Sequence, residues 1–264
     1  MLRVLAITGN QPRHRYIVEK LQDTGNLVGW ISEEREPFIP SAPSELSANL
    51  QKLYLRHFNN RANSENHFFA PRNEIAVPSP IVTRDELNSP ETIKMINGFL
   101  PDLVISYGCH KLSSVLISSC RANFWNTHGG LSPEYRGVIT HFWPSYNLEP
   151  QMTGMTLHQT TDQIDGGSIF HQSVSNLVPG DGIHELAARA VINFGDSLQG
   201  IMDSISQKDV PVGVRQNFSG RVYRNSDWRP EHLKLIYEQF DDKIVDQVLS
   251  GDLLGRVPSL ISVF

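Results

Sequence analysis

Residues 124–137 read Phe-Trp-Asn-Thr-His-Gly-Gly-Leu-Ser-Pro-Glu-Tyr-Arg-Gly. The apolar residues end at Trp125, and the polar side chains of Asn126 and His128 follow. This pattern predicts a buried strand that carries both polar side chains at its carboxyl end. Residues two apart in an extended chain project from the same face. Because ligands of open α/β sheets bind at the carboxyl ends of the strands, the stretch predicts both a fold and the position of a site.

Asn126 and His128 can act in one reaction together with Asp165, which belongs to the later Asp-Gly-Gly sequence. When an amine attacks a formyl or acyl carbon, negative charge develops on the carbonyl oxygen, and an amide N–H with an imidazolium N–H can stabilise it. The amine must also lose a proton, either to His128 or to a water held by Asp165. A nearby carboxylate is expected to raise the pKa of His128. The three residues therefore predict formyl transfer without a covalent nucleophile.

The pattern of apolar residues elsewhere predicts strands and helices in alternation. Residues 2–8, a helix at 11–23 and a strand at 27–31 form a strand-helix-strand unit. Further strands are expected at 74–80, 103–107, 154–159 and 168–174, and helices at 46–58, 88–99 and 181–205. The fold class predicted is α/β, with a Rossmann-like, doubly wound and mostly parallel sheet.

Two segments lie outside this alternation. Residues 57–69 are dense in polar and aromatic side chains, and they are interpreted either as a lid or as a peripheral helix and loop. The last residues hold alternating Val212 and Val214, then Val222 and Tyr223, and a helical pattern that begins at Pro230. We expect a catalytic domain at 1–208 and a C-terminal extension at 209–264, made of a small hairpin and an amphipathic helix.

Composition excludes several classes of protein. The 264 residues carry a net charge of −5 with mixed signs, which argues against nucleic acid as the main partner. No apolar run approaches the ~18 residues that span a bilayer, so no membrane partner is expected. Two cysteines and an N-terminus without a secretory pattern indicate a reducing, cytoplasmic location.

The histidines and cysteines raise two further possibilities, a metal site and a cysteine nucleophile. The spacing of His128, His141, His158 and His171 matches no usual zinc signature, so no metal is expected. Cys109 followed by His110 could be a nucleophile and its base, but neighbouring residues in a loop at a strand end usually point apart. A small residue that packs beside a ring is the favoured interpretation of Cys109.

Several separate motifs agree with one known family. They are Asn126-x-His128, Leu131-Ser132-Pro133-x-Tyr135-Arg136-Gly137, Thr153-Gly154-x-Thr156-x-His158 and Asp165-Gly166-Gly167. In this order they resemble the folate-dependent formyltransferases, over roughly the first two hundred residues. The resemblance implies that Asn126, His128 and Asp165 are catalytic. It also implies N10-formyltetrahydrofolate as the formyl donor.

The resemblance implies where the two substrates bind. The formyl donor would lie against two loops, made by Cys109, His110, Lys111 and Leu112 and by Thr161, Asp162, Gln163 and Ile164. The turn after the first strand, with Asn10, Arg13, His14 and Arg15, offers backbone donors and guanidinium groups for a phosphate or diphosphate of the acceptor. Arg136 and Gly137 would shape the site around the amine.

The acceptor expected is a nucleotide-linked amino sugar, as in the sugar N-formyltransferases that serve lipopolysaccharide O-antigen biosynthesis. Chain length, the 57–69 segment and the acidic tail favour it. Alternatives are a transformylase acting on a purine precursor such as glycinamide ribonucleotide, and a hydrolase of formyltetrahydrofolate. A Rossmann-type module that only binds its ligand would leave the three catalytic candidates unexplained. The C-terminal extension is a candidate surface for a homodimer.

Overall fold

The computed structural model describes residues 2–207, 210–217 and 220–264. Within these residues a seven-stranded sheet has the order β3-β2-β1-β4-β5-β7-β8. Its strands are β1 (Val4–Gly9), β2 (Leu27–Glu33), β3 (Ile81–Val82), β4 (Leu103–Tyr107), β5 (Asn123–His128), β7 (Gly154–Gln159) and β8 (Ile169–Val174). The pairs from β3 to β5 are parallel, whereas β7 and β8 run antiparallel. The expected Rossmann-like, mostly parallel α/β sheet is confirmed.

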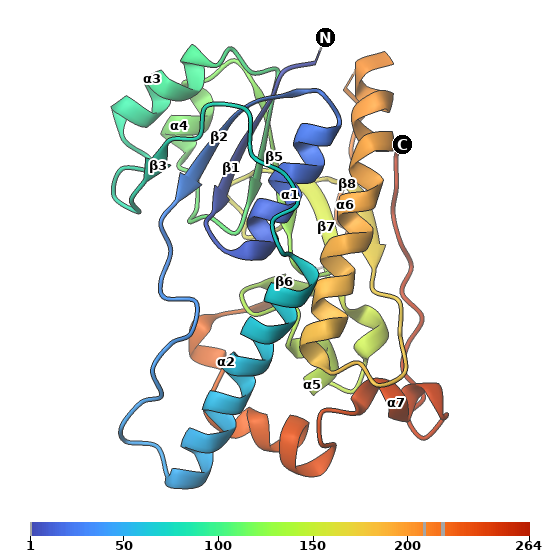
Figure 1. The fold of residues 1–264 in the computed structure, drawn as a ribbon. Helices are drawn as coiled ribbons and strands as arrows, with labels where there is room; N and C mark the ends of the chain where they lie inside the picture. Colours follow the sequence, from blue (N-terminus) through green and yellow to red (C-terminus); the bar gives the residue numbers. More distant parts are fainter. Residues whose placement is uncertain (1, 208–209, 218–219) are drawn as a thin grey trace.

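The sheet is covered on both faces because consecutive residues of its central strands are apolar. In β1, Val4 and Ala6 pack with α1 (Pro12–Asp23) and α6 (Ile183–Gln207). Leu5 and Ile7 project to the other face, where α3 (Pro90–Gly98) and α4 (Ser114–Ser118) contribute to a second cluster. A strand with apolar residues on both faces is buried on both faces. Figure 1 shows α1 and α6 side by side along the sheet.

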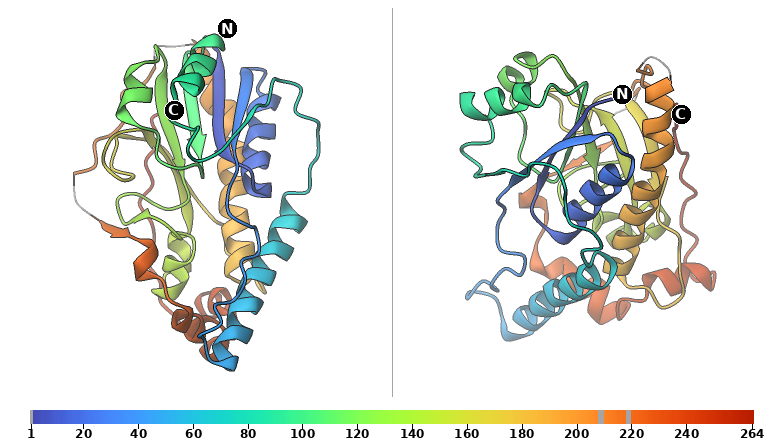
Figure 2. Two further views of the ribbon diagram at one scale, coloured as in Figure 1. Left: turned by 90° about the vertical axis from the view of Figure 1, so that its left-hand side faces the viewer. Right: turned by 45° about the horizontal axis from the view of Figure 1, so that its top comes forward.

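A third group of elements lies at the end to which the parallel strands point. It contains α2 (Ala48–Phe68), α5 (Trp143–Tyr146), α7 (Ile244–Leu249), the two-stranded sheet of β6 (Tyr135–Gly137) and β9 (Arg221–Tyr223), and the short helices η1 (Pro150–Met152), η2 (Asn225–Asp227), η3 (Pro230–His232) and η4 (Leu235–Gln239). Figure 2 shows these elements converging at the narrow end of the molecule. Buried apolar residues from α2, α5 and the C-terminal segment share one cluster there.

One helix and one strand before β4 differ from the expectation. The helix expected at 46–58 continues through most of the 57–69 segment, so α2 is one helix from Ala48 to Phe68. The strand expected at 74–80 was wrong, since regular pairing with β2 begins only at Ile81. Pro78 and Pro80 have no N–H to donate to a ladder, but their carbonyl oxygens accept from Trp30 at 3.0 Å and Ser32 at 2.9 Å.

The C-terminal extension also differs from expectation. Among the described residues no hairpin forms there, because β9 pairs in parallel with β6 and Val214 makes an isolated bridge with Ile169. The helix expected from Pro230 onward is interrupted. Asp241 and Asp242 have φ of 47° and 60°, which a continuous right-handed helix excludes. The segment therefore packs against the first two hundred residues rather than on itself.

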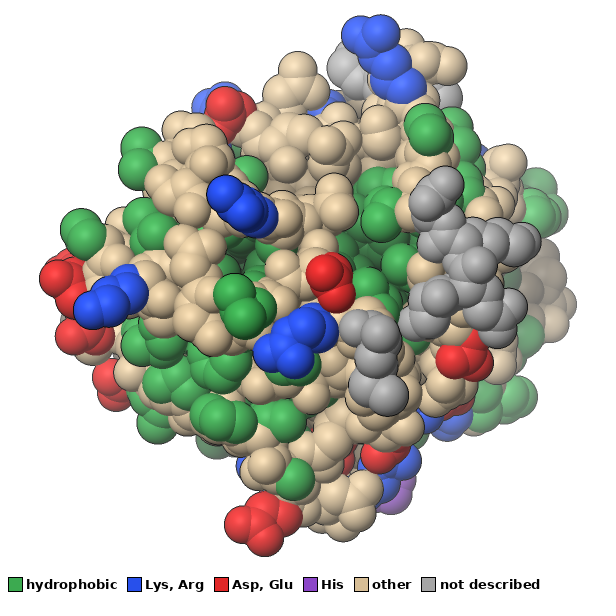
Figure 3. Space-filling model, turned by 90° about the horizontal axis from the view of Figure 1, so that it is seen from above, with side chains coloured by type: hydrophobic (Ala, Val, Ile, Leu, Met, Phe, Trp, Pro, Cys, Tyr) green, Lys and Arg blue, Asp and Glu red, His purple; other side chains and the backbone are tan. Residues whose placement is uncertain are grey.

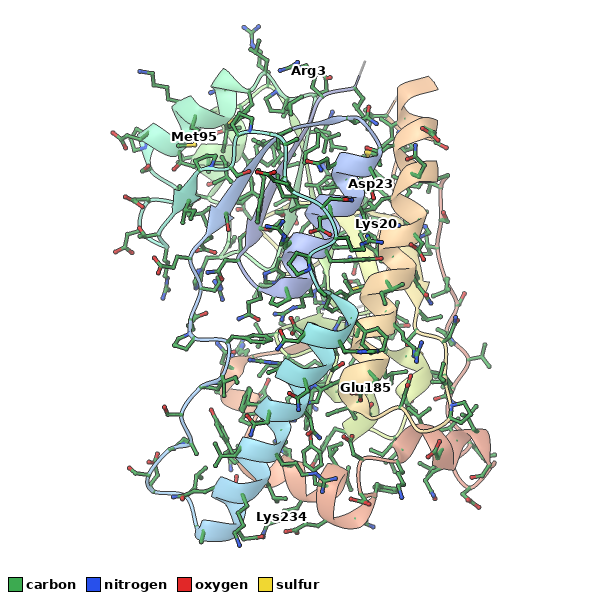
Figure 4. The ribbon with its side chains drawn as sticks, viewed as in Figure 1. Arg3, Lys20, Asp23, Met95, Glu185 and Lys234 are labelled. Atoms are coloured by element: carbon green, nitrogen blue, oxygen red, sulfur yellow. The ribbon has the colours of Figure 1, made fainter. Side chains whose placement is uncertain are left out.

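Figure 4 relates the labelled side chains to the two ends of the molecule: Arg3 and Met95 lie at one end, and Lys234 lies at the other, near α2. Glu185, in the first turn of α6, lies toward the α2 end. Figure 3 views the opposite end, where basic and acidic side chains are interspersed rather than gathered by sign. In the part of the chain that the structure describes, no helix is both long and apolar enough to cross a bilayer.

Candidate active site

A cleft of about 860 Å³ opens at the carboxyl ends of β1, β4 and β5. Its lining includes residues of α1, α2 and α6, the loop after β4, Phe142 just before α5, and Asn225 and Trp228 of the C-terminal segment. Asn126, His128 and Asp165 all line it. The three catalytic candidates from separate parts of the sequence are therefore brought together.

Asn126 is held in one orientation by its neighbours. Its Oδ1 accepts a hydrogen bond from the hydroxyl of Ser106 on β4 at 2.9 Å. Its Nδ2 therefore faces the opposite way, 3.2 Å from Nε2 of His158 and 3.4 Å from Oδ1 of Asp165. An amide fixed in this way can donate an N–H to a developing oxyanion without first reorganising.

His128 is buried beside the same carboxylate, with only 6% of its surface exposed. Its Nε2 lies 2.7 Å from the carbonyl oxygen of Tyr135, so Nε2 must carry a hydrogen and donate it. In the neutral ring, Nδ1 is then the acceptor nitrogen, and it lies 3.4 Å from Oδ2 of Asp165. A proton accepted at Nδ1 would lie directly opposite a carboxylate.

Asp165 adopts a left-handed backbone conformation, with φ of 45°, just before two glycines. Its Oδ2 accepts from the backbone N–H of Gly137 at 2.8 Å. Its carbonyl oxygen accepts from Ser132 at 3.2 Å and from the side chain of Gln216 at 2.9 Å. Gln216 belongs to the C-terminal segment, so that segment helps to hold the turn that contains Asp165.

Charge in this group differs from the sequence-based expectation in one respect. Burial lowers the pKa of His128, and the opposing effects of Asp165 and of the Tyr135 carbonyl do not reverse it. Asp165 raises the pKa of His128 as expected, but burial outweighs this effect and the net shift is downward. Burial raises the pKa of Asp165. The opposing effects of His128, His158 and the Gly137 N–H are together larger, so the net shift is downward. Near pH 7 the resting pair is a neutral imidazole beside a carboxylate.

The residues expected to contact the formyl donor divide into two groups. Cys109, His110 and Lys111 line the cleft, but Leu112 is 3% exposed and belongs to the apolar cluster under α3 and α4. Thr161, Asp162, Gln163 and Ile164 form the loop that leads to Asp165 and are absent from the cleft lining. Nζ of Lys111 donates to the carbonyl oxygen of Asp162 at 3.0 Å, so the two loops meet beside the cleft.

Cys109 is a thiol rather than a nucleophile in this setting. Burial, with a further contribution from Glu33, raises its pKa to about 12. His110 is turned to Glu33 instead, with Nδ1 2.6 Å from Oε1 and its backbone N–H 2.7 Å from Oε2. This arrangement ties the loop after β4 to the end of β2 and leaves Cys109 without a base.

The residues expected to hold the acceptor are also divided. Arg13 lines the cleft, with Nη1 2.5 Å from Oε1 of Glu65. His14 lines it too, but the ring is 2% exposed and burial lowers its pKa well below the usual value, so it is a neutral group. Its Nε2 is 2.1 Å from the place of a Cβ on Gly108, a residue with φ of 65°, so only glycine fits there.

Of the remaining acceptor candidates, Asn10, Arg15 and Arg136 lie outside the lining. Asn10 is exposed, and Arg15 binds Oε1 of Glu19 at 3.0 Å and the carbonyl oxygen of Asn73 at 2.8 Å. Arg136 donates through Nη2 to the carbonyl oxygen of Gly220 at 2.9 Å, whereas Gly137 lines the cleft and donates to Asp165.

Sequence reasoning gave no role to four residues at the site. His158 and Ser106 hold Asn126, and their signal was available, since both lie on strands next to β5 in the register of the sheet. Arg61 and Trp228 line the cleft from segments that the pattern alone treated as peripheral. Among the described residues, no group of three or more His, Cys, Asp or Glu side chains is arranged to hold a metal ion.

Solved structures share this fold. They include a sugar N-formyltransferase from Shewanella sp. FDAARGOS_354 (TM-score 0.55, 18% identity, 89% of this chain and 87% of that chain covered). Phosphoribosylglycinamide formyltransferase from Anaplasma phagocytophilum gives a TM-score of 0.56 at 17% identity, covering 84% and 97%. Glycinamide ribonucleotide transformylase 1 from Symbiobacterium toebii gives 0.55 at 13% identity, covering 81% and 92%. At these identities the likeness establishes the fold alone.

The family follows from the sequence match. The family model described as "Formyl transferase" matches residues 47–196, which is more than half of the 264-residue chain. The matched range contains Asn126, His128 and Asp165. The chain belongs to the formyl transferase family and is a folate-dependent formyltransferase.

Proposed function

We propose that the protein transfers the formyl group of N10-formyltetrahydrofolate to the amine of a nucleotide-linked amino sugar. The observation that carries the proposal is the convergence of Asn126, His128 and Asp165 in one cleft of about 860 Å³. Pockets that hold one drug-sized ligand measure roughly 300–1,000 Å³. The volume is in the upper part of this range, which supports an extended acceptor beside the formyl donor.

The charge of the lining supports anionic ligands. Five cationic side chains line the cleft against three carboxylates: Arg13, Arg35, Arg61, Arg84 and Lys111 against Glu36, Glu65 and Asp165. A formyl donor carries the carboxylates of its glutamate part, and a nucleotide-linked sugar carries a diphosphate. Guanidinium groups bind both kinds of anion through paired hydrogen bonds.

The residues can carry the transfer step as follows. The formyl donor supplies an activated carbonyl carbon bonded to N10. As the acceptor amine bonds to that carbon, Nδ2 of Asn126 donates to the oxygen that becomes negative. His128 accepts the proton lost by the amine at Nδ1, where Asp165 stabilises the imidazolium. When the bond from the carbon to N10 breaks, the proton passes from His128 to N10, and the products are the N-formyl sugar and tetrahydrofolate.

The proposal is tested by supplying N10-formyltetrahydrofolate with separate acceptors and following the release of tetrahydrofolate. The panel contains nucleotide-linked amino sugars, the matching free amino sugars, glycinamide ribonucleotide, and no acceptor. We expect release with one nucleotide-linked sugar and little with its free sugar. Equal release from the free sugar would overturn the nucleotide requirement. Preference for glycinamide ribonucleotide would establish the purine alternative, and release without acceptor would establish the hydrolase.

A further inference from the structure

Aromatic side chains gather in one part of the cleft, between α2, α5 and the C-terminal segment. We call this part the aromatic end and define it by His57, Phe58, Phe142 and Trp228, all of which line the cleft. The ring of Trp228 lies 6.1 Å from His57 and 6.2 Å from Phe58 and Phe142, measured between centroids. Trp228 is only partly buried, so one part of its ring remains available to a ligand.

Two hydrogen-bond donors at this end have no acceptor. Nε1 of Trp228 and Nε of Arg61 are both buried and lack a partner among the described residues. Arg61 also lines the cleft, with its guanidinium carbon 4.8 Å from the centre of the Phe58 ring. A buried donor without an acceptor is costly, and such groups in folded proteins are rare. A ligand that brings oxygen acceptors would satisfy both donors.

The charge beside the aromatic end is not balanced. Glu65 pairs with Arg13 and, among the described residues, is the one carboxylate that acts on both Arg13 and Arg61. Burial lowers the pKa of Arg61, and the charge of Arg13 lowers it further, because the two cations repel each other. The neighbouring histidines add no charge, since burial lowers the pKa of His57 to about 3 and that of His184 well below its usual value. Two guanidinium groups thus face one carboxylate, and an anionic ligand would balance the remaining positive charge.

We infer that the aromatic end and its two arginines bind the nucleoside diphosphate part of the acceptor, with the diphosphate against Arg13 and Arg61 and the base against Trp228 and Phe58. The inference rests on the proposed function and assigns its substrate class to named residues. Bases stack on aromatic rings, and guanidinium groups suit diphosphate oxygens. A phosphoribosyl acceptor without a base would use the arginines but leave the aromatic rings without a partner.

The inference gives the C-terminal segment a direct part in binding. Trp228 comes from that segment, Phe58 and Arg61 come from α2, and Arg13 comes from α1. Trp228 also contacts Tyr54 of α2, at 6.2 Å between ring centroids. A base held at this point lies between the two segments.

Calorimetric titration of the whole protein with UDP, thymidine diphosphate, GDP, pyrophosphate and uridine tests the inference without formyl transfer. At least one nucleoside diphosphate should bind about tenfold more tightly than pyrophosphate, because stacking of the base adds to the attraction between the diphosphate and the arginines. Trp228→Leu should weaken that binding about fivefold or more, and Trp228→Phe should weaken it less. Arg61→Ala should weaken the binding of that nucleoside diphosphate about tenfold, and it should weaken the binding of pyrophosphate by a similar factor.

Arg56→Ala is the matched control, because Arg56 is on the same helix but outside the cleft and pairs with Asp241 at 3.0 Å. We expect this variant to bind nucleoside diphosphates like the unaltered protein. An unchanged midpoint of thermal unfolding would show that each variant is folded. The inference is overturned if pyrophosphate binds as tightly as every nucleoside diphosphate, or if both Trp228 variants bind normally. Formyl transfer to a nucleotide-linked sugar could still be observed in that case, so the two failures are distinguishable.

Discussion

Asp165 and His128 face each other across 3.4 Å, from Oδ2 of the carboxylate to Nδ1 of the imidazole. Because Nε2 donates to the Tyr135 carbonyl, the nitrogen that faces Asp165 is the one that can accept a proton. The arrangement is unfavourable for a resting neutral ring and favourable for a protonated one. Asp165 is therefore placed to stabilise a proton on Nδ1 of His128, which is the role we propose for it in formyl transfer.

Asp165→Asn should lower kcat by about 100-fold or more and change the KM for N10-formyltetrahydrofolate little, since general acid-base and electrostatic contributions have this size. Steady-state kinetics with each substrate varied separately measures the effect. The exposed Asp85 provides a control, and Asp85→Asn should leave kcat and the KM for N10-formyltetrahydrofolate near their normal values. A folded Asp165→Asn enzyme with near-normal kcat would contradict the assignment.

The pH dependence should report a depressed pKa for His128. A base must be neutral, so kcat at saturating acceptor should rise with pH through a pKa below 6.5 and be flat above it. Asp165 raises the pKa of His128, so the acidic limb should move to lower pH in Asp165→Asn. An NMR titration of the His128 ring in both proteins measures the same shift. A pKa above 6.5, or one that the substitution leaves in place, would refute this account.

Arg13 and Arg15 should behave differently although they are two residues apart. Arg13 lines the cleft, whereas Arg15 binds Glu19 and the Asn73 carbonyl. Arg13→Ala should raise the acceptor KM about tenfold, because a charge-assisted contact is lost, and should leave the folate KM unchanged. Arg15→Ala should change the acceptor KM by less than about twofold. Similar effects of the two substitutions on the acceptor KM would refute the distinction.

Acid should destabilise the protein because several buried histidines are neutral. Burial lowers the pKa of His57 to about 3 and of His141 to about 4. The unfolded chain takes up these protons near pH 6.5 while the folded chain does not, so stability falls as pH drops below that value. Each such histidine should lower the free energy of unfolding by about 2 kcal/mol at pH 5. Asp242, whose pKa burial raises to about 6, works in the opposite direction.

Thermal unfolding at pH 7, 6 and 5 checks the expectation, and Tm should fall with pH over this range. In His141→Gln the free energy of unfolding should depend less steeply on pH, because about one proton fewer is taken up on unfolding. A Tm that is constant or rises from pH 7 to pH 5 would show that the buried histidines take up protons in the folded state.

The sequence predicted the sheet because β1, β4 and β5 are short apolar runs that end in polar or glycine residues. It also predicted that Asn126 and His128 would lie at a strand end, since both are part of β5. Their local pattern is strong because a strand buried on both faces admits few polar residues before its end. The long α6 was predicted for a similar reason, as its apolar period persists over many turns.

Sequence patterns could not predict the C-terminal pairing or the role of α2. β9 pairs with β6, which precedes it by more than eighty residues, and no local pattern encodes a partner at that distance. The sequence left residues 57–69 open between a lid and a peripheral helix and loop, because their polar and aromatic side chains face the cleft and the C-terminal segment instead of a uniform core. Tertiary contacts decide the conformation of such a segment.

The sequence by itself therefore determined the fold class and the chemical groups Asn126, His128 and Asp165, because strand patterns and short motifs are local. Only the tertiary structure decided the protonation of His128, since the pKa depends on the balance between burial and one carboxylate at 3.4 Å. It also decided that Arg61 and Trp228 share one end of the cleft. These residues meet because α2 and the C-terminal segment bury a common apolar cluster, and that packing involves the whole chain.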